Sequence, residues 1–450
     1  MFGTFDEVFA VGVRLYQAGN VQRSADYFAH AIEIQPDAIT AYVNLGMVLR
    51  RLNQLDASLG VLLRGLDVAP RSPECHMDLA LTYGDLDRFP ESLRHLTLAN
   101  ALSDAYLPRY NMAALYARMG HYQDSLFWYD KTLEVAPEDH EARFFKACAL
   151  LALGRFEDGW AGYELRRSKT SDTVPLSGPE WRGERSCQQS HEHILVHAEQ
   201  GFGDTIQSAR YIALVASRFG KVSVVPGGEL VRLFQHSFAH LTNVAVMIDV
   251  PEAYDCHVWI DSLMGIFGAG LDDLSNAPYL CAPSTTEWST RLAVLDGIRI
   301  GIVWSGGHSE YRANKYRSLR FEQIAGLLDV PGCSFVSLQM GAHAGVSTGI
   351  FDASPYIDDW QDTAAAIAAL DLVISVDTST AHLAGAMGTP VWLLNQFQSC
   401  WRWGLTEPST RWYPSMRIIR QPCLFDWPSV LAEARDGLLA LTAPLHSSLA

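Results

Sequence analysis

The sequence lacks the features that would place the protein in a membrane, on a nucleic acid or in an oxidising compartment. It has no run of about 18 apolar residues, so no membrane-spanning helix is expected. Its 34 Lys and Arg residues face 50 Asp and Glu, and the resulting net charge of −16 argues against general binding to nucleic acids or anionic membranes. The eight cysteines form no Cys-x-x-Cys pair, which predicts free thiols and no zinc site. With no basic and apolar leader at the N-terminus, these absences predict a cytoplasmic protein.

The sequence does contain ample material for packed cores. The chain has 450 residues, of which 48% are hydrophobic and 19% charged. This is an ordinary globular composition, and the length allows two or three domains.

The first third of the chain has an internal period. A turn-forming residue, followed two places later by an apolar residue, recurs at spacings of 34, 34, 33 and 34. Apolar residues at helical spacing lie on both sides of each turn. A helix–turn–helix period of 34 residues resembles the tetratricopeptide repeat, and about five repeats are predicted over residues 1–168. The five turn residues are Gly19, Asn53, Asp87, Gly120 and Gly154.

Two glycines of the repeats fall where that family favours a small residue for close helix packing. They are Gly12 and Gly46, which are 34 residues apart. Arrays of this kind form a concave surface that usually binds a protein segment. The alternative role is a spacer or an oligomerisation module, in which case the protein would be a homo-oligomer.

The rest of the chain alternates predicted strands and helices in two blocks. Residues 169–192 are rich in Ser, Pro, Gly and charge and are predicted to be a linker, with Trp181 anchoring it on a neighbouring domain. Two α/β lobes are expected over residues 193–283 and 284–427. Residues 428–450 are predicted to form a C-terminal helix and tail, with the helix returning to the first lobe.

The most informative stretch is residues 371–395. Leu372 to Val376 is a short apolar run typical of a buried parallel strand. Polar residues that favour helix starts follow at once, and a second buried strand begins after Pro390. The helix N-terminus between the strands offers free N–H groups and a positive dipole end, which suit a diphosphate. The same pattern also fits a plain strand–helix–strand unit whose polar turn only caps the helix.

This stretch resembles a known donor site. Asp377-Thr378, His382, Gly385 and Gly388-Thr-Pro390 resemble the donor-site signature of the ADP-heptose transferase-like glycosyltransferases. The resemblance implies a GT-B fold, in which two Rossmann-like lobes face a cleft and the C-terminal lobe holds a nucleotide sugar. The predicted fold class is therefore α plus α/β, a TPR α-solenoid followed by two Rossmann-like lobes.

The resemblance also implies which residues bind the donor. The Gly-rich, basic loop 304–318 would lie beside the donor phosphates, where cations offset the charge of the leaving diphosphate without a metal or a cofactor. A solvated charged loop is the alternative. The aromatic segments at Trp401 and Trp412 would either stack on the sugar or base, or simply pack. The predicted donor-binding residues are Ser305, Lys315, Arg317, Ser318, Gln339, Asp377, Thr378, Ser379, Thr380 and His382.

The loop of residues 199–204 resembles the acceptor side of the same family. Transfer needs a base to take the proton of the acceptor hydroxyl, and Asp204 is the first candidate and Glu199 the second. A carboxylate that only stabilises a helix N-terminus is the alternative for Asp204. The predicted acceptor-side residues are His197, Gln200 and Gly203, although a lone His at a strand end is more often structural.

These patterns predict a metal-independent glycosyltransferase. The donor is a nucleotide sugar and the favoured acceptor is a Ser or Thr hydroxyl of a protein recruited by the repeats. This last step is an analogy with O-GlcNAc transferase and with repeat-bearing flagellin glycosyltransferases. Two alternatives stay open: a heptosyltransferase-like enzyme of surface polysaccharide synthesis, and a repeat scaffold with an inactive transferase module.

Overall fold

The structure is a computed structural model that describes residues 3–169, 176–184, 192–268, 278–306, 312–341, 345 and 349–447. The chain divides into two compact units, residues 1–150 and 151–450. We name them the repeat unit and the α/β unit. In the described part of the chain, no helix is long and apolar enough to cross a membrane.

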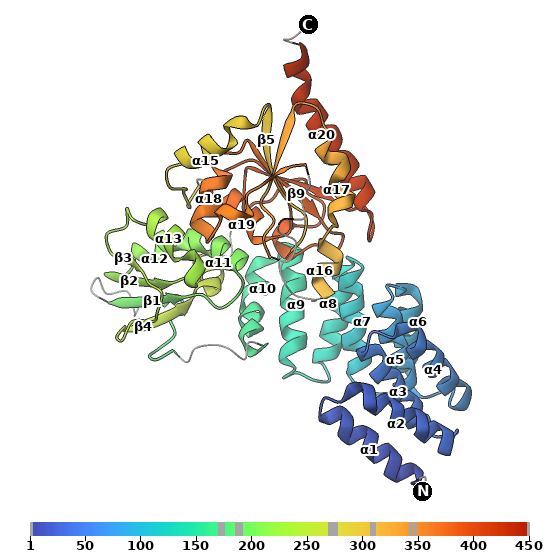
Figure 1. Cartoon of the computed structure of the whole chain (residues 1–450). Coiled ribbons are helices and arrows are strands. Elements are labelled where there is room, and N and C mark those ends of the chain that lie inside the picture. Colours follow the sequence, from blue (N-terminus) through green and yellow to red (C-terminus); the bar gives the residue numbers. More distant parts are fainter. Residues whose placement is uncertain are drawn as a thin grey trace. The chain divides into compact units, whose positions relative to one another are not determined.

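The repeat unit is built of antiparallel helix pairs that resemble tetratricopeptide repeats (Figure 1). The predicted turn residues all have positive φ, from 59° at Asn53 and Asp87 to 79° at Gly19. Gly, Asn and Asp are the residues that tolerate this conformation, which explains their recurrence. The helices are α1 (Phe5–Gln17), α2 (Val21–Ile34), α3 (Ile39–Arg51), α4 (Leu55–Val68), α5 (Pro73–Asp85), α6 (Phe89–Leu102), α7 (Leu107–Arg118), α8 (Tyr122–Leu133) and α9 (His140–Ala152), which runs into the α/β unit.

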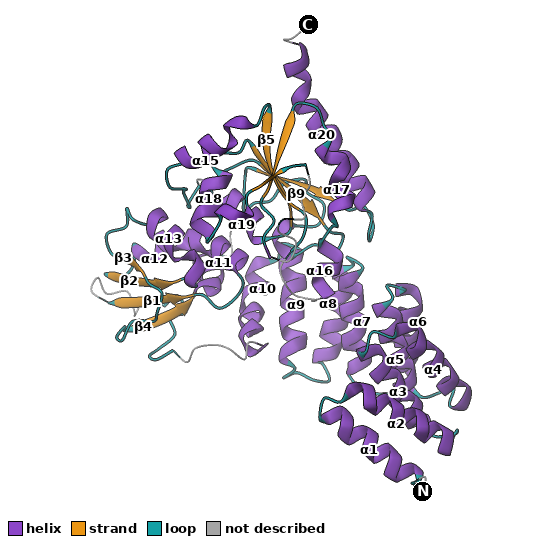
Figure 2. Ribbon diagram, viewed as in Figure 1, coloured by secondary structure: helices purple, strands orange, loops and turns teal. Residues whose placement is uncertain are grey.

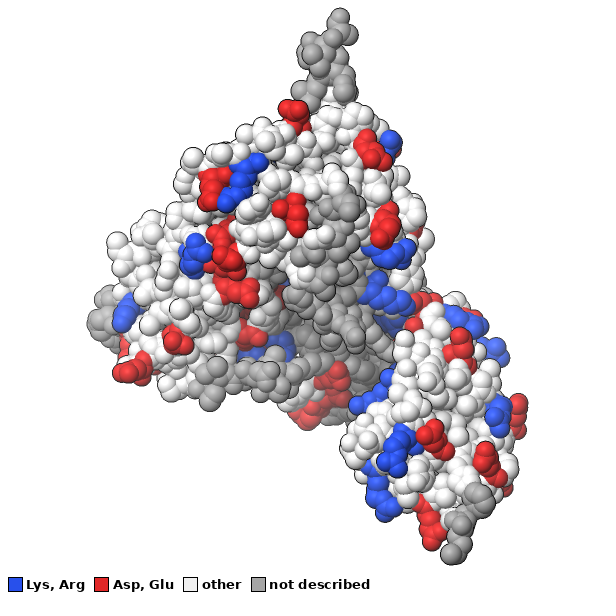
Figure 3. Space-filling view, viewed as in Figure 1, with Lys and Arg blue, Asp and Glu red and all other residues white. Residues whose placement is uncertain are grey.

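Close contacts repeat with the same period as the turns. A Cβ atom at Gly12 would lie 2.8 Å from a ring carbon of Phe28, and one at Gly46 would overlap Leu62, so the predicted need for small residues is confirmed. Buried serines also recur. Ser58 donates to the Gly46 carbonyl and Ser92 to the Ala80 carbonyl, each at 2.7 Å. On the face seen in Figure 3, acidic and basic side chains of this unit are interspersed.

The α/β unit contains two parallel sheets. In the first lobe, the strand order is β3-β2-β1-β4, and Figure 2 shows helices over one face of the sheet. Trp181 is buried against Phe219, with ring centroids 5.1 Å apart, so the linker is anchored as predicted. The elements are α10 (Phe156–Tyr163), β1 (His193–His197), α11 (Phe202–Ser208), α12 (Ile212–Ala216), β2 (Lys221–Val225), α13 (Val231–Ser237), β3 (Val244–Val246), β4 (Cys256–Trp259) and α14 (Leu263–Phe267).

The second lobe has a six-stranded parallel sheet with the order β10-β9-β8-β5-β6-β7. Helices α15, α18 and α19 lie on one side of it, and α17 and α20 on the other (Figure 1). The elements are α15 (Thr286–Arg291), β5 (Ile298–Val303), α16 (Arg312–Arg317), α17 (Phe321–Leu328), β6 (Cys333–Ser337), β7 (Phe351–Asp352), α18 (Trp360–Ile367), β8 (Leu372–Val376), α19 (Ser379–Ala386), β9 (Val391–Asn395), β10 (Met416–Arg420) and α20 (Trp427–Ser447).

The C-terminal helix corrects one expectation. Helix α20 packs mainly on α17, β9 and β10 of the second lobe, and no described element of the first lobe makes a comparable contact with it. Its Trp427, Val430, Ala434 and Leu438 belong to the same buried core as Trp392 of β9. These apolar residues follow helical spacing, and the second sheet supplies the surface that covers them.

Candidate functional site

The site is assembled at the carboxyl edge of the six-stranded sheet. Because β5, β6 and β8 are parallel neighbours, the segments that follow them meet at one edge. Gln339, which follows β6, binds the backbone of Ser305 at this edge. Its amide oxygen accepts from the Ser305 N–H at 2.9 Å, and its amide nitrogen donates to the Ser305 carbonyl at 3.1 Å. Gln339 therefore fixes the backbone that leaves β5, in addition to lining the site.

The basic loop after β5 returns to the same edge. Residues 307–311 of this loop lie outside the described residues. Ser318 accepts a hydrogen bond from the Gly306 N–H at 3.1 Å. A Cβ atom at Gly306 would lie 2.7 Å from Nε of Arg317, so the guanidinium packs directly on the glycine backbone. The missing side chain at Gly306 thus makes room for Arg317.

Helix α19 presents its N-terminus at this edge. Thr378 is the extended N-cap residue, but its side chain makes no capping hydrogen bond. Its hydroxyl lies 2.9 Å from the Ser375 hydroxyl instead. The Thr378 side chain therefore does not cap the first amides of α19, which are the groups that a helix N-terminus offers to an anion.

These segments surround a cavity of about 480 Å³. The second lobe supplies most of the lining, including six of the predicted donor-binding residues. The first lobe contributes Phe202 and Glu229, neither of which was predicted to bind the donor. The Phe202 ring lies 5.5 Å from the Trp360 ring at the start of α18. The lining residues used below are Ser305, Arg317, Gln339, Thr378, Ser379 and Thr380.

The other predicted donor residues lie elsewhere. Lys315 is exposed and its ammonium lies 5.3 Å from the centre of the Phe425 ring. Asp377 is half-buried, and burial raises the pKa of its carboxyl while the charges of Arg317 and Arg402 oppose the rise. Neither residue lines the cavity, and neither does Ser318, which acts on the loop backbone.

His382 contributes to packing between the lobes. It is 5% exposed, and Nδ1 lies 2.8 Å from the Tyr413 hydroxyl. Burial lowers the pKa of His382 well below its ordinary value, so the ring is neutral. A Cβ atom at Gly203 would lie 3.0 Å from Cδ2 of His382, so a larger residue here would require the His382 ring to shift. Gly203 is therefore explained by the close approach of α11 to α19.

Asp204, the first candidate base, is one residue beyond Gly203 in α11. Its side chain is 26% exposed and forms an ion pair with Arg402, whose side chain is 9% exposed. Arg402 also donates to the Gln207 side chain and, at 3.2 Å, to the Cys400 sulfur. The carboxylate that would accept a proton is thus already engaged by a buried guanidinium.

Glu199, the second candidate base, is buried. Its side chain is 1% exposed and paired with Arg166, which also binds Glu164 at 2.8 Å. Burial raises the pKa of Glu199 to about 7, and the charge of Arg166 opposes this rise. It does not line the cavity.

The remaining acceptor-side candidates do not line the cavity either. His197 lies at the end of β1, where Nδ1 is 2.5 Å from the Ala198 carbonyl and the ring contacts Trp259. Burial lowers the pKa of His197. Gln200 is half-buried in the loop that follows β1.

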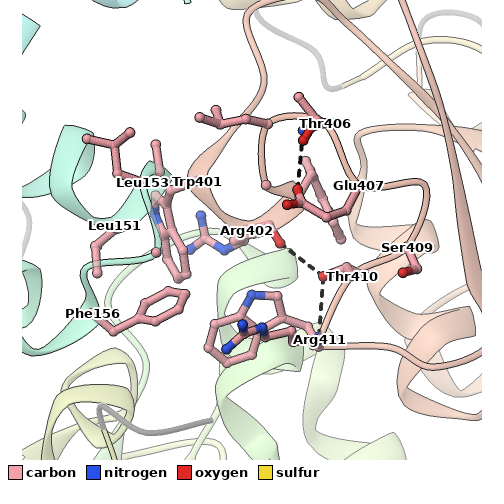
Figure 4. Close-up of a pocket in the computed structure, with 16 residues that line it drawn as sticks. Leu151, Leu153, Phe156, Trp401, Arg402, Thr406, Glu407, Ser409, Thr410 and Arg411 are labelled. Carbon is pink, nitrogen blue, oxygen red and sulfur yellow. Dashed lines mark hydrogen bonds between the residues drawn. The ribbon is translucent and has the colours of Figure 1, made fainter. Parts of the chain in front are cut away.

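A second cavity of about 380 Å³ lies beyond Arg402. We name it the aromatic pocket. Figure 4 shows Leu151, Leu153, Phe156 and Trp401 on one side of it and Thr406, Glu407, Ser409 and Thr410 on the other. The aromatic segments can be recognised in the sequence but the pocket cannot, because its walls come from positions about 250 residues apart.

Metal-ligating side chains do not converge in the described residues. No group of three or more His, Cys, Asp or Glu side chains there could hold an ion. Any binding of a diphosphate by the described residues of the larger cavity would therefore rest on amides, hydroxyls and Arg317.

Comparisons with known proteins extend over both units. No family model matches the sequence. Protein FlbA of Caulobacter vibrioides is 28% identical over 441 residues, which cover 88% of this chain and 72% of that protein. Because neither unit alone makes up 88% of the chain, the similarity includes parts of both units.

Solved structures match a smaller part of the chain. Pseudomonas aeruginosa PilF is 16% identical and covers 38% of this chain and 78% of its own, with a TM-score of 0.35. MamA of Desulfovibrio magneticus RS-1 is 14% identical and covers 38% of this chain and all of its own, with a TM-score of 0.32.

Proposed function

We propose that the protein is a glycosyltransferase of the GT-B type that uses a nucleotide sugar. The observation that carries the proposal is the larger cavity at the sheet edge. It combines the N-terminus of α19, which the Thr378 side chain does not cap, with the half-buried guanidinium of Arg317. Both features favour a diphosphate, because amides and a cation offset its charge.

The first lobe supports the acceptor half of the proposal. Phe202 lines the donor cavity, and Asp204 lies two residues further along α11. A base at this position would lie beside the reacting sugar once the donor is bound. The acceptor hydroxyl would have to compete with Arg402 for the Asp204 carboxylate. The repeat unit is a module of the protein-binding kind, and we propose that it recruits a protein whose Ser or Thr accepts the sugar.

A repeat scaffold that binds a nucleotide sugar without transferring it is the second candidate. The observation that favours it is the Asp204–Arg402 ion pair, which neutralises the proposed base. In this case the nucleotide would only stabilise the fold by mass action.

A calorimetric titration of the full chain with nucleoside diphosphates tests the donor site. We expect one of the uridine, adenosine, guanosine or cytidine diphosphates to bind, and the affinity to persist in excess chelator because we propose no metal in the site. Hydrolysis or transfer of the matching nucleotide sugar would then separate the enzyme from the scaffold. If none of the four diphosphates binds, the donor assignment is wrong.

A further inference from the structure

We propose that the aromatic pocket is a subsite for an apolar side chain of a polypeptide acceptor. This inference rests on the proposed function, and it assigns a binding subsite to the proposed protein acceptor. It starts from the position of the pocket, since Arg402 lines it and pairs with Asp204. One guanidinium therefore separates the pocket from the proposed base.

One side of the pocket is apolar, and two buried tryptophans form its floor. Trp401 and Trp412 are 7% and 4% exposed and their ring centroids are 5.7 Å apart. Phe156 and Leu153 are half-buried at the mouth. An apolar side chain that enters would remove these partly exposed surfaces from water without ordering the floor, which is already packed.

The tryptophan rings do not offer a platform for a sugar. The Arg402 guanidinium lies 4.3 Å from the centre of the Trp401 ring, and Trp160 packs with it at a centroid separation of 5.4 Å. A sugar would need an open ring face, and these contacts leave the Trp401 ring little exposed. The lining therefore favours a compact aliphatic or aromatic side chain.

The rim is polar and carries one acidic and one basic side chain, Glu407 and Arg411. Backbone N–H groups lower the pKa of Glu407, and Oε2 accepts from the Thr406 N–H at 3.2 Å, so this carboxylate turns toward its own loop. Arg411, which is exposed, lies on the same rim. Hydroxyls of Thr406 and Ser409 remain at the mouth, where a peptide main chain could bind.

Ligand-detected NMR with the full chain tests the assignment. The probes are N-acetyl-leucinamide, N-acetyl-phenylalaninamide and methyl β-glucoside at millimolar concentration. The variants are Leu153→Asn and Phe156→Ala, with Leu63→Asn as a matched control at a leucine of the repeat unit that is 44% exposed. Thermal unfolding shows whether each variant is folded. If loss of the Phe156 ring disturbs packing, Leu153→Asn still tests the pocket.

We expect both amides to bind the wild type and the control, and to bind Leu153→Asn and Phe156→Ala about tenfold more weakly, as for a lost hydrophobic contact. Methyl β-glucoside that binds in preference and is lost in the same variants would overturn the peptide assignment. Amides that fail to bind, or that bind all variants equally, would also overturn it.

Nucleoside diphosphate binding in the same samples separates this inference from the proposed function. Amide binding without any diphosphate binding would overturn the donor site and leave the subsite standing. Diphosphate binding without amide binding would overturn the subsite alone.

Discussion

The two lobes of the α/β unit differ in how their charged side chains are arranged. At the carboxyl end of the first sheet, Asp204 and Glu199 are already paired with arginines. At the carboxyl edge of the second sheet, Arg317 and the first amides of α19 border an open cavity. In the second lobe, a guanidinium and the start of a helix line the cavity, whereas in the first lobe the two carboxylates are held in ion pairs.

The largest effect is expected where the first lobe loses its proposed base. Asp204→Asn keeps the shape of the side chain and removes its basicity, so transfer should fall by about 10²–10⁴-fold, as for a lost general base. Donor binding should survive, because the cavity that binds the diphosphate is lined mainly by the second lobe. Initial rates of sugar transfer and calorimetric donor affinity measure the two quantities.

Asp249→Asn serves as the control, because this carboxylate is exposed in the same lobe. Transfer that is equal in the Asp204→Asn variant and the wild type would exclude Asp204 as the base.

A smaller effect is expected where the second lobe loses its cation. Arg317→Ala should weaken nucleoside diphosphate binding by about 1.5–3 kcal/mol, the range for a hydrogen bond to a charged group. The matched control is Arg320→Ala, an exposed arginine three residues further along that does not line the cavity. Equal affinities of the two variants in calorimetry would contradict the role of Arg317.

A third difference concerns the pH dependence of stability in the first lobe. Asp261 is 1% exposed, and burial, together with the charge of Asp204, raises its pKa to about 6. Between its ordinary pKa of 3.8 and about 6, the folded state holds a proton that the unfolded state has released. Raising the pH through this window therefore destabilises the fold, by about 3 kcal/mol at most.

Asp261→Asn should remove this slope, because the amide does not titrate, while its oxygen can still accept from Ser208 as the carboxylate does at 2.6 Å. Melting temperatures of variant and wild type at pH 4, 5, 6 and 7 measure the effect. We expect the melting temperature of the variant to rise relative to that of the wild type as the pH increases. A constant difference would show that Asp261 does not titrate in this range.

The smallest effect is expected at the ion pair that links the lobes at the surface. Arg232 of α13 binds Asp359 at 2.9 Å and Asp362 at 3.5 Å, but its side chain is 54% exposed. Solvent and salt screen such pairs, so Arg232→Ala should cost less than about 1 kcal/mol, and less still at high salt. A melting temperature that falls equally at low and high salt would argue for lost packing instead.

The features that the sequence predicted are those encoded locally. Strand β8 has the predicted bounds, Leu372–Val376, because a continuous apolar run before a polar turn has few other solutions. The repeats were found because a positive φ limits each turn to a few residue types.

The features that the sequence did not predict depend on contacts between distant segments. Glu229 and Phe202 reach the cavity from the first lobe, more than 70 residues before the nearest segment of the second lobe that lines it. The partner of Asp204 is Arg402, 198 residues away. The two-residue strand β7 is too short to show any periodicity. Such pairings are set by tertiary packing, which no local pattern records.

A crystal structure of the full chain with the nucleoside diphosphate that binds most tightly tests the central claim most directly. The account predicts that the diphosphate lies at the start of α19, within hydrogen-bond distance of the Ser379 or Thr380 amide and of the Arg317 guanidinium. A nucleotide bound elsewhere, or one whose phosphates avoid both α19 and Arg317, would contradict it.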